Sequence, residues 1–320
     1  MSHRLVQISG AIADLIYRVE AVPVAGQEAI VHGATMAAGG GFNAMVAARR
    51  FGMDVVYGGT LGSGPFADMV AKALDDEGIV RLRPRLESCD QGSCVVLVDG
   101  HGERTFIASQ GADGIVSVAD LARLDLRAGD WVLLSGYALY YDGSRDALTT
   151  WLQDMPEGIR LVFDPSPMIG MICERARRAA LAHSLWISAN VQEAMSLTGT
   201  DEPARAARML ADGRPGQGGA VVRDGANGCF LALSGQAPCH LPAFPVETID
   251  TNGAGDIHIG VFIATLASGQ SPFHAAHLAN IAAALSTTRE GPSMAPTRAV
   301  VSAAEALGQA RVSDQKRSLP

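Results

Sequence analysis

Short apolar runs alternate along the chain with segments whose apolar residues recur every three to four positions. The runs predict buried strands, beginning with Leu5–Ile8, and the periodic segments predict helices such as Pro65–Glu77. Further strands are predicted at Val55–Tyr57, Trp131–Leu134, Leu161–Phe163, Leu185–Ser188, Ala220–Val222 and Cys229–Leu233, and further helices at Arg145–Gln153, Cys173–Ala182, Val191–Leu197, Pro203–Ala211, Ile257–Ser268, Pro272–Thr287 and Thr297–Ala310. This alternation predicts a three-layer α/β fold with a doubly wound, mostly parallel sheet between helices.

Two stretches depart from the alternation. Glu28–Met36 is β-like and poor in core residues, and Gly92–Ala108 has two apolar runs around the polar turn Asp99–Gly102, which is a hairpin signal. We expect these stretches to form a small β-sheet lid from segments of about 12–36 and 92–108, outside the main sheet. Residues 1–312 are then expected to form a single domain, with a frayed tail at 313–320.

The predicted lid also suggests how the chain associates. We expect its outer face to carry the apolar residues Ile30, Val31, Val95, Val96 and Leu97. An exposed apolar sheet favours pairing with another sheet. The sequence therefore predicts a homodimer joined through the lids, an inference that also rests on the family that the motifs below resemble.

Composition narrows the class of protein. The chain has 320 residues, 48% of them hydrophobic, and a net charge of −8, which is typical of a soluble globular protein. The lack of a Lys/Arg run argues against nucleic acid or a membrane surface as a partner. No apolar stretch approaches the ~20 residues of a membrane span, and no signal-peptide core is present, so we expect a cytoplasmic protein.

The stretch Asp250–Asp256 carries the clearest chemistry. It places carboxylates around three small residues, Gly253, Ala254 and Gly255, and leads into an apolar helix. Small residues let backbone N–H groups approach a phosphate, and a helix N-terminus attracts one. A carboxylate at such a site, Asp256, can accept a proton from a hydroxyl that attacks phosphorus. The alternative is an ordinary turn in which Asp256 caps the helix.

Other polar residues follow predicted strands or begin predicted helices. The run Gly39–Asn43 lacks the G-x-G-x-x-G spacing of dinucleotide sites, so it is either a tight turn or a substrate loop in which Asn43 binds hydroxyl groups. Asp14 follows the first strand, where open sheets bind ligands, or it forms a simple Asx turn. Asn190 can cap a helix, and Glu193, one turn later, can face a metal or a phosphate.

The run Gly39–Asn43 together with Asp250–Asp256 resembles the two signature regions of the PfkB carbohydrate kinases, the ribokinase-like family. The resemblance covers nearly the whole chain. Gly62–Ala67 resembles the loop before the family's second helix, and Asn190 with Glu193 resembles its N-x-x-E motif. The resemblance implies a ribokinase-like fold with a β lid, and an ATP-dependent phosphotransferase acting on a hydroxyl of a sugar or sugar-like molecule.

The resemblance also implies a role for each matching residue. The catalytic base would be Asp256, with an anion hole formed by Gly253, Ala254 and Gly255. Substrate hydroxyls would be held by Asp14, Gly40, Gly41 and Asn43. The nucleotide would be bound by Arg223, which stands where a threonine is frequent, and by Gly225, Gly228 and Asn280. The phosphates and Mg²⁺ would be served by Asn190 and Glu193. A K⁺ site would involve Asp250, Asn252, Ser286, Arg289 and Gly291.

Departures from the family pattern bear on the substrate. Members acting on ribose often carry a lysine where this chain has Gly40 and a glutamate where it has Ser135–Tyr137, so ribose is disfavoured. No basic residue lies in Gly39–Asn43, which disfavours a phosphorylated sugar, although His32 and Arg104 on the lid could supply charge. A nucleoside kinase, with few aromatic residues to stack a base, and a catalytically idle ligand-binding protein stay open as alternatives.

Overall fold

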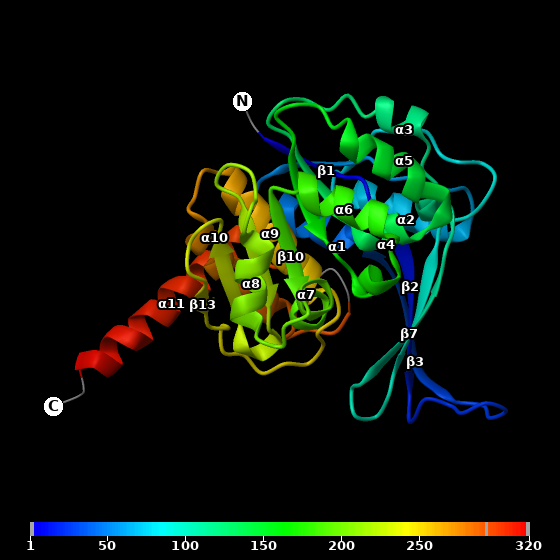
Figure 1. Ribbon diagram of the computed structural model, residues 1–320. Helices are drawn as coiled ribbons and strands as arrows, with labels where there is room; N and C mark the ends of the chain where they lie inside the picture. The colour runs from blue at the N-terminus through cyan, green and yellow to red at the C-terminus, as the bar shows by residue number, and fades with distance from the viewer. Residues whose placement is uncertain (1–2, 292–293, 318–320) are drawn as a thin grey trace.

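Within residues 3–291 and 294–317, which the computed structural model describes, the chain has a nine-stranded sheet and a separate four-stranded sheet (Figure 1). The strand order of the large sheet is β13 (Cys239–Leu241), β12 (Cys229–Leu233), β11 (Gly219–Arg223), β10 (Trp186–Asn190), β9 (Arg160–Asp164), β8 (Trp131–Ser135), β1 (Arg4–Gln7), β4 (Asp54–Tyr57) and β5 (Val80–Arg81). Neighbours are parallel except at β12, which is antiparallel to β11 and β13. The predicted doubly wound, mostly parallel sheet is confirmed.

Alternating apolar residues of the strands face two helical layers. Leu5 and Trp131 belong to the core on one face, and Val6 and Val132 belong to the core on the other. The first face packs against α1 (Gly41–Arg50), α2 (Pro65–Asp76), α9 (Ala254–Ala267), α10 (Pro272–Ser286) and α11 (Arg298–Arg317). The second face packs against α3 (Val118–Ala122), α4 (Gly136–Tyr140), α5 (Asp142–Gln153), α6 (Glu174–His183), α7 (Val191–Thr198), α8 (Pro203–Ala211) and the 3₁₀ turn η2 (Pro167–Met171). Both faces of the sheet are therefore buried, as parallel pairing requires.

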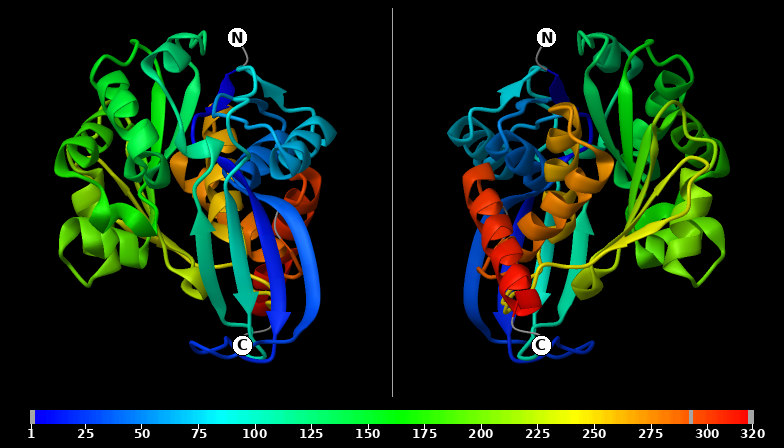
Figure 2. Two further views of the ribbon diagram at one scale, coloured as in Figure 1. Left: turned by 90° about the vertical axis from the view of Figure 1, so that its right-hand side faces the viewer. Right: turned by 90° about the vertical axis from the view of Figure 1, so that its left-hand side faces the viewer.

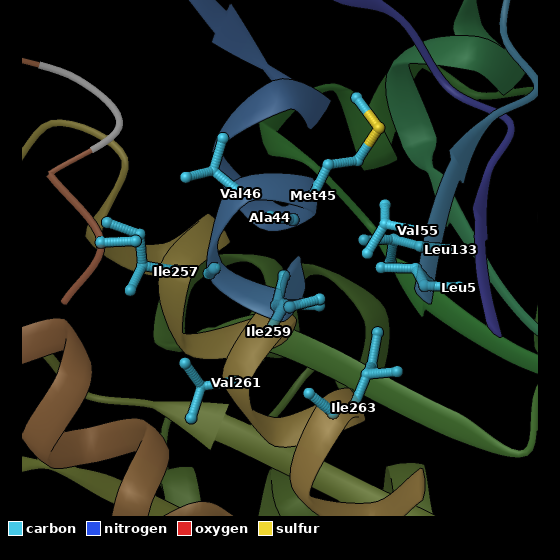
Figure 3. Packing of buried hydrophobic residues seen from close by; sticks show 14 of the residues in the cluster. Leu5, Ala44, Met45, Val46, Val55, Leu133, Ile257, Ile259, Val261 and Ile263 are labelled. Atoms are coloured by element: carbon cyan, nitrogen blue, oxygen red, sulfur yellow. The ribbon is translucent and has the colours of Figure 1, made fainter. Parts of the chain in front are cut away.

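Helices α1 and α9 pack closely over the sheet. Figure 3 shows side chains of α9, among them Ile257, Ile259 and Ile263, beside the first turns of α1. The two backbones approach because Gly260 has no side chain: a Cβ there would lie 2.2 Å from the carbonyl oxygen of Ala44. This contact fixes the middle of α9 against the start of α1.

The lid is the four-stranded sheet, with the order β3 (Val31–Gly40), β2 (Ala11–Val19), β6 (Ser93–Val98) and β7 (Arg104–Ser109). Figure 2 (left) shows its strands side by side, running from the middle of the molecule to its lower edge. The predicted hairpin is confirmed as β6 and β7. The other lid prediction began too early, since β3 starts at Val31 rather than Glu28.

The lid has a buried inner face and a more exposed outer face. Ile16, Cys94, Val96 and Val98 form a small buried cluster on the inner face. The prediction of Val96 as an outer residue is therefore wrong; it is 1% exposed. By strand register the outer face carries Leu15, Tyr17, Met36, Val95, Leu97 and Ile107.

Helix boundaries correct three further predictions. The glycine run is no loop, because β3 continues to Gly40 and α1 begins at Gly41. Helix α9 starts at Ala254, three residues earlier than predicted. Helix α11 projects from the body (Figure 1) and continues to Arg317, so the predicted tail is helical from 313 to 317, and residues 318–320 lie outside the described residues.

No helix in the described part of the chain is long and apolar enough to cross a membrane.

Candidate active site

A cavity of about 860 Å³ opens between the inner face of the lid and the carboxyl ends of the parallel strands. Such ends are where open α/β sheets bind ligands. The sequence-predicted residues that line it are Asp14, Gly40, Gly41, Asn43, Asn190, Glu193, Arg223, Asn252, Gly253, Gly255 and Asp256. The predicted residues outside its lining are Ala254, Gly225, Gly228, Asp250, Asn280, Ser286, Arg289 and Gly291.

Helix α9 begins at the floor of this cavity. Its N-cap is Gly253, whose φ of 75° is left-handed and therefore suits glycine. No side chain caps the helix, so the interpretation of Asp256 as a capping residue is wrong. Because N–H groups in the first turn have no partner within a helix, the start of α9 can bind an anion.

Asp256 lies in this first turn and lines the cavity. The Asn43 side-chain amide donates to Asp256 Oδ2 over 3.3 Å, across the contact between α1 and α9. Burial raises the pKa of Asp256 to about 7, and the nearby charge of Asp164 adds to the rise, while Asn43 and Arg223 oppose it. A carboxyl group with a pKa near neutrality is suited to exchange protons with a bound hydroxyl.

Asp14 faces the cavity from the middle of β2 rather than from the loop predicted after the first strand. Burial raises its pKa to about 7, opposed by a hydrogen bond from the Asn252 side chain. A Cβ on Gly39 would lie 2.0 Å from Asp14 Oδ2. The glycine run therefore makes room for the Asp14 carboxylate as well as for a ligand.

Asn190 and Glu193 form a reciprocal capping box at the start of α7. Asn190 Oδ1 accepts from the Glu193 N–H and Glu193 Oε2 accepts from the Asn190 N–H, both over 2.8 Å. The capping interpretation of Asn190 is therefore confirmed. Burial and the charge of Asp164 raise the pKa of Glu193 to about 7, and Arg223 opposes them.

Asp164 is a cavity residue that the sequence interpretation missed. It ends β9, and burial raises its pKa despite the charge of Arg223. The sequence does contain a signal for Asp164. Like Asp14, it is an aspartate just after a predicted strand, here Leu161–Phe163, and open α/β sheets bind ligands at strand ends.

An ion pair joins the lid to the loop before α9. The Arg104 guanidinium, on β7, lies 2.5 Å from Asp250 Oδ1 and donates to Thr251 Oγ1 over 2.6 Å. Asp250 also accepts from the N–H groups of Asn252 and Gly291 over 2.8 and 3.0 Å. Burial would raise the Asp250 pKa, but these hydrogen bonds and Arg104 together lower it. The lid is thus held over the cavity.

Comparison with known proteins decides the family. The model of the pfkB family carbohydrate kinases matches residues 2–298. The chain belongs to this family. It is 30% identical over 296 residues to an uncharacterized sugar kinase, YegV, of Escherichia coli, covering 91% of this chain and 90% of that protein. It is 30% identical over 267 residues to a fructokinase of Klebsiella pneumoniae, covering 78% and 85%.

Solved structures agree with the PfkB assignment at the level of the fold. Ribokinase from Giardia lamblia superposes with a TM-score of 0.83 at 20% identity, covering 95% of this chain and all of that one. Arabidopsis thaliana ribokinase complexed with ribose and ATP gives 0.75 at 22%, covering 95% and 99%. The protein is therefore a sugar or nucleoside kinase of the PfkB type with a ribokinase-like fold.

Of the residues predicted to bind the nucleotide of this PfkB kinase, Arg223 lines the cavity, whereas Gly225, Gly228 and Asn280 lie outside its lining. Gly225 has a φ of 52° and open space where a side chain would be. Gly228, with a φ of 97°, packs against the backbone, since a Cβ would lie 2.1 Å from the Leu241 oxygen. Asn280 is buried and donates to the oxygens of Leu241 and Pro242. Its contact with adenine stays a prediction.

Among residues 3–291 and 294–317, no group of three or more His, Cys, Asp or Glu side chains is arranged to hold a metal ion. Glu193 and Asp164 nevertheless both line the cavity. Mg²⁺ at phosphate sites usually takes one or two carboxylates and the phosphates rather than a protein cage. The donor chemistry therefore fits Mg²⁺ that arrives with a nucleotide.

Proposed function

We propose that this PfkB kinase transfers the terminal phosphoryl group of ATP to a hydroxyl of a neutral sugar or sugar-like polyol. The observation that carries the proposal is the position of Asp256, in the first turn of α9 and hydrogen-bonded to Asn43 at the floor of the lid-covered cavity. A carboxyl group with a pKa near 7 at a helix start that can bind an anion is suited to accept the proton of a hydroxyl that attacks a bound phosphate.

In the proposed reaction, Asp14 and Asn43 hold the substrate so that one hydroxyl faces Asp256. Asp256 accepts the proton of that hydroxyl while its oxygen forms a bond to the terminal phosphorus of ATP. The bond between this phosphorus and the ADP oxygen breaks, and the first-turn N–H groups at Gly255 stabilise the charge on the transferred group. The closed lid excludes water, which would otherwise compete with the substrate hydroxyl.

Each of the two arginines that line the cavity in the described residues has an acidic partner, which supports a neutral acceptor. In the described residues, the cationic side chains lining the cavity are Arg104, paired with Asp250, and Arg223, beside Glu193; His101 is also present at the lid turn. Asp14 would repel an anionic sugar unless a cation were placed to receive it. Sugar acids and sugar phosphates are therefore expected to be poor acceptors.

A nucleoside kinase is the second candidate, and the cavity itself favours keeping it. Three aromatic side chains, Phe106, Tyr137 and Tyr141, line the cavity. Phe106 is 58% exposed and Tyr137 is 38% exposed, so each has a free surface on which a base could stack. The cavity therefore offers more aromatic surface for stacking a base than the low aromatic content of the whole chain suggests.

The test is a screen for acceptor-dependent ADP release across pentoses, hexoses, ketoses, sugar acids and nucleosides. We expect neutral sugars or polyols to give the highest kcat/KM. Turnover confined to nucleosides would establish the second candidate instead. If no acceptor gives ADP release although ATP raises the melting temperature, a catalytically idle ligand-binding protein is favoured instead.

We further propose that Mg²⁺ is obligatory and that K⁺ stimulates. Bound Mg²⁺ would neutralise phosphate charge beside Glu193 and Asn190, where carboxylates already gather. The Asp250 carboxylate and the backbone near Gly291 offer oxygen ligands of the kind K⁺ takes, although Arg104 already neutralises part of the charge of Asp250.

We therefore expect EDTA to abolish turnover and excess Mg²⁺ to restore it, and rates in potassium buffer to exceed those in tetramethylammonium buffer. Activity that survives EDTA would contradict the Mg²⁺ proposal. Equal rates in the two buffers would contradict the K⁺ proposal.

A further inference from the structure

Arg223 ends β11 inside the cavity wall, between the starts of two helices. It pairs in register with Asn190, the residue that caps α7. Its side chain is only 13% exposed, yet it lines the cavity. Burial in the cavity wall therefore restricts the guanidinium group of Arg223, whereas the side chain of a surface arginine could move freely.

The contacts of Arg223 hold one edge of the guanidinium. Nη1 donates to Ser188 Oγ over 2.8 Å. Nη2 lies 3.6 Å from Glu193 Oε2, which is an ion pair but longer than a hydrogen bond. These contacts orient the plane of the guanidinium group and leave Nη2 able to donate to a ligand.

The same guanidinium lies against the start of α9. The position of a Cβ on Gly255 would be 3.7 Å from Arg223 Cζ and Nε and 3.8 Å from Nη2. Because Gly255 has no side chain, the gap between the guanidinium and the first turn of α9 has room for about one methyl group. An anion bound by the N–H groups of that turn would therefore touch Arg223.

The charges around this space require a cation. Asp164, Glu193 and Asp256 all line the cavity, and the second arginine there, Arg104, is paired with Asp250. The positive charge of Arg223 lowers the pKa values of all three carboxyl groups and so favours their ionised forms. A phosphate entering beside three carboxylates gains most from a guanidinium, which can donate two parallel hydrogen bonds.

We infer that Arg223 is a catalytic residue that donates to the transferred phosphoryl group, with Ser188 and Glu193 orienting it, and that it carries part of the charge neutralisation otherwise left to Mg²⁺. This inference rests on the proposed phosphoryl transfer. It assigns Arg223 to the terminal phosphate rather than to the nucleotide in general. A threonine at this position would give one neutral hydrogen bond and no charge.

The test compares Arg223→Met and Arg223→Lys with the wild-type enzyme, using the best acceptor from the screen. For Arg223→Met we expect kcat to fall about 10²–10³-fold, as for the loss of one oriented donor in a transition state. The Mg²⁺ concentration for half-maximal rate should rise. Arg223→Lys should have a higher kcat and a lower half-maximal Mg²⁺ concentration than Arg223→Met, because lysine keeps the charge but not the planar pair of donors.

A binding measurement separates this role from general nucleotide binding. Calorimetry with Mg²⁺ and either ADP or the non-hydrolysable imido analogue of ATP reports contacts to the terminal phosphate without turnover. Arg223→Met should weaken the imido analogue about tenfold more than ADP, because hydrogen bonds to charged groups are individually strong. Melting curves identify any variant that fails to fold, and Arg223→Lys then carries the comparison.

Equal weakening of ADP and the imido analogue, or an unchanged kcat in a folded Arg223→Met variant, would overturn the inference. A wild-type enzyme that releases no ADP with any acceptor would instead overturn the proposed function. The two failures are distinguishable because the binding comparison does not need an acceptor.

Discussion

Three carboxyl groups in the cavity share one physical property. Burial raises the pKa values of Asp14, Glu193 and Asp256 to about 7. For Asp256 this means that the group is partly protonated at neutral pH in the free enzyme. A general base must be ionised before it can accept a proton, so its raised pKa should appear in the pH dependence of the rate.

We expect kcat/KM for the acceptor to rise with pH through about 7 and then level off. At one pH unit below the pKa only about a tenth of a carboxyl group is ionised, so the rate at pH 6 should be about tenfold below the plateau. The measurement is kcat/KM between pH 5 and 9 at saturating Mg²⁺–ATP. A profile that is flat from pH 5.5 to 8 would contradict Asp256 as the base.

At the residue scale, the predicted residues that the structure places in the cavity include those that lie in short, continuous motifs. Asp256 and Asn43 come from such motifs, and the structure brings them together. The Arg104 pair with Asp250 could not be predicted, since the two residues are 146 positions apart and meet only when the lid folds over the α9 loop. Long-range pairing of this kind leaves no local pattern.

At the scale of the elements, the contact between α1 and α9 positions the proposed base. Asn43 lies in the first turn of α1 and Asp256 in the first turn of α9, and Gly260 lets the two backbones approach. The sequence predicted the helix at Ile257–Ser268 from its apolar residues but not its contact with α1. It also interpreted Gly39 and Gly40 as a loop, because glycines in a strand look like a turn when the strand they pair with is not known.

This packing can be tested with Gly260→Ala. The new Cβ would meet the Ala44 carbonyl group, a backbone atom that cannot rotate away, so we expect a loss of stability of about 1–3 kcal/mol and a lower kcat as Asp256 moves from Asn43. The matched control is Gly170→Ala, where a Cβ meets nothing within 4 Å. Thermal unfolding and kcat are measured for both. Equal stability of the two variants would show that the helices do not depend on this close approach.

At the scale of the whole molecule, the lid exposes apolar side chains on its outer face. Met36 is 64% exposed and Ile107 is 57% exposed, and Leu15 lies between their strands by register. Exposed apolar sheets tend to be covered by another molecule. We propose that the lids of two copies pair. The sequence predicted an apolar lid but assigned Val96 to the wrong face, because one residue of register reverses every side chain.

The dimer proposal predicts that Met36→Lys is monomeric in sedimentation velocity at micromolar concentration, since pairing would bury the new charge. Wild type should sediment as a dimer. Met171→Lys is the matched control, because Met171 is 65% exposed but lies on η2, away from the lid. A monomeric wild type, or two variants that behave alike, would count against association through the lid.

The most direct measurement of the central claim is kcat for Asp256→Asn together with its melting curve and ATP affinity. The amide keeps the shape of the carboxylate and can still accept from Asn43, and no helix cap is lost, so the fold and ATP binding should persist. It cannot accept the hydroxyl proton, and we predict a fall in kcat of ~10²–10⁴-fold. A near-wild-type kcat with an unchanged melting curve would remove Asp256 from the mechanism and contradict the account.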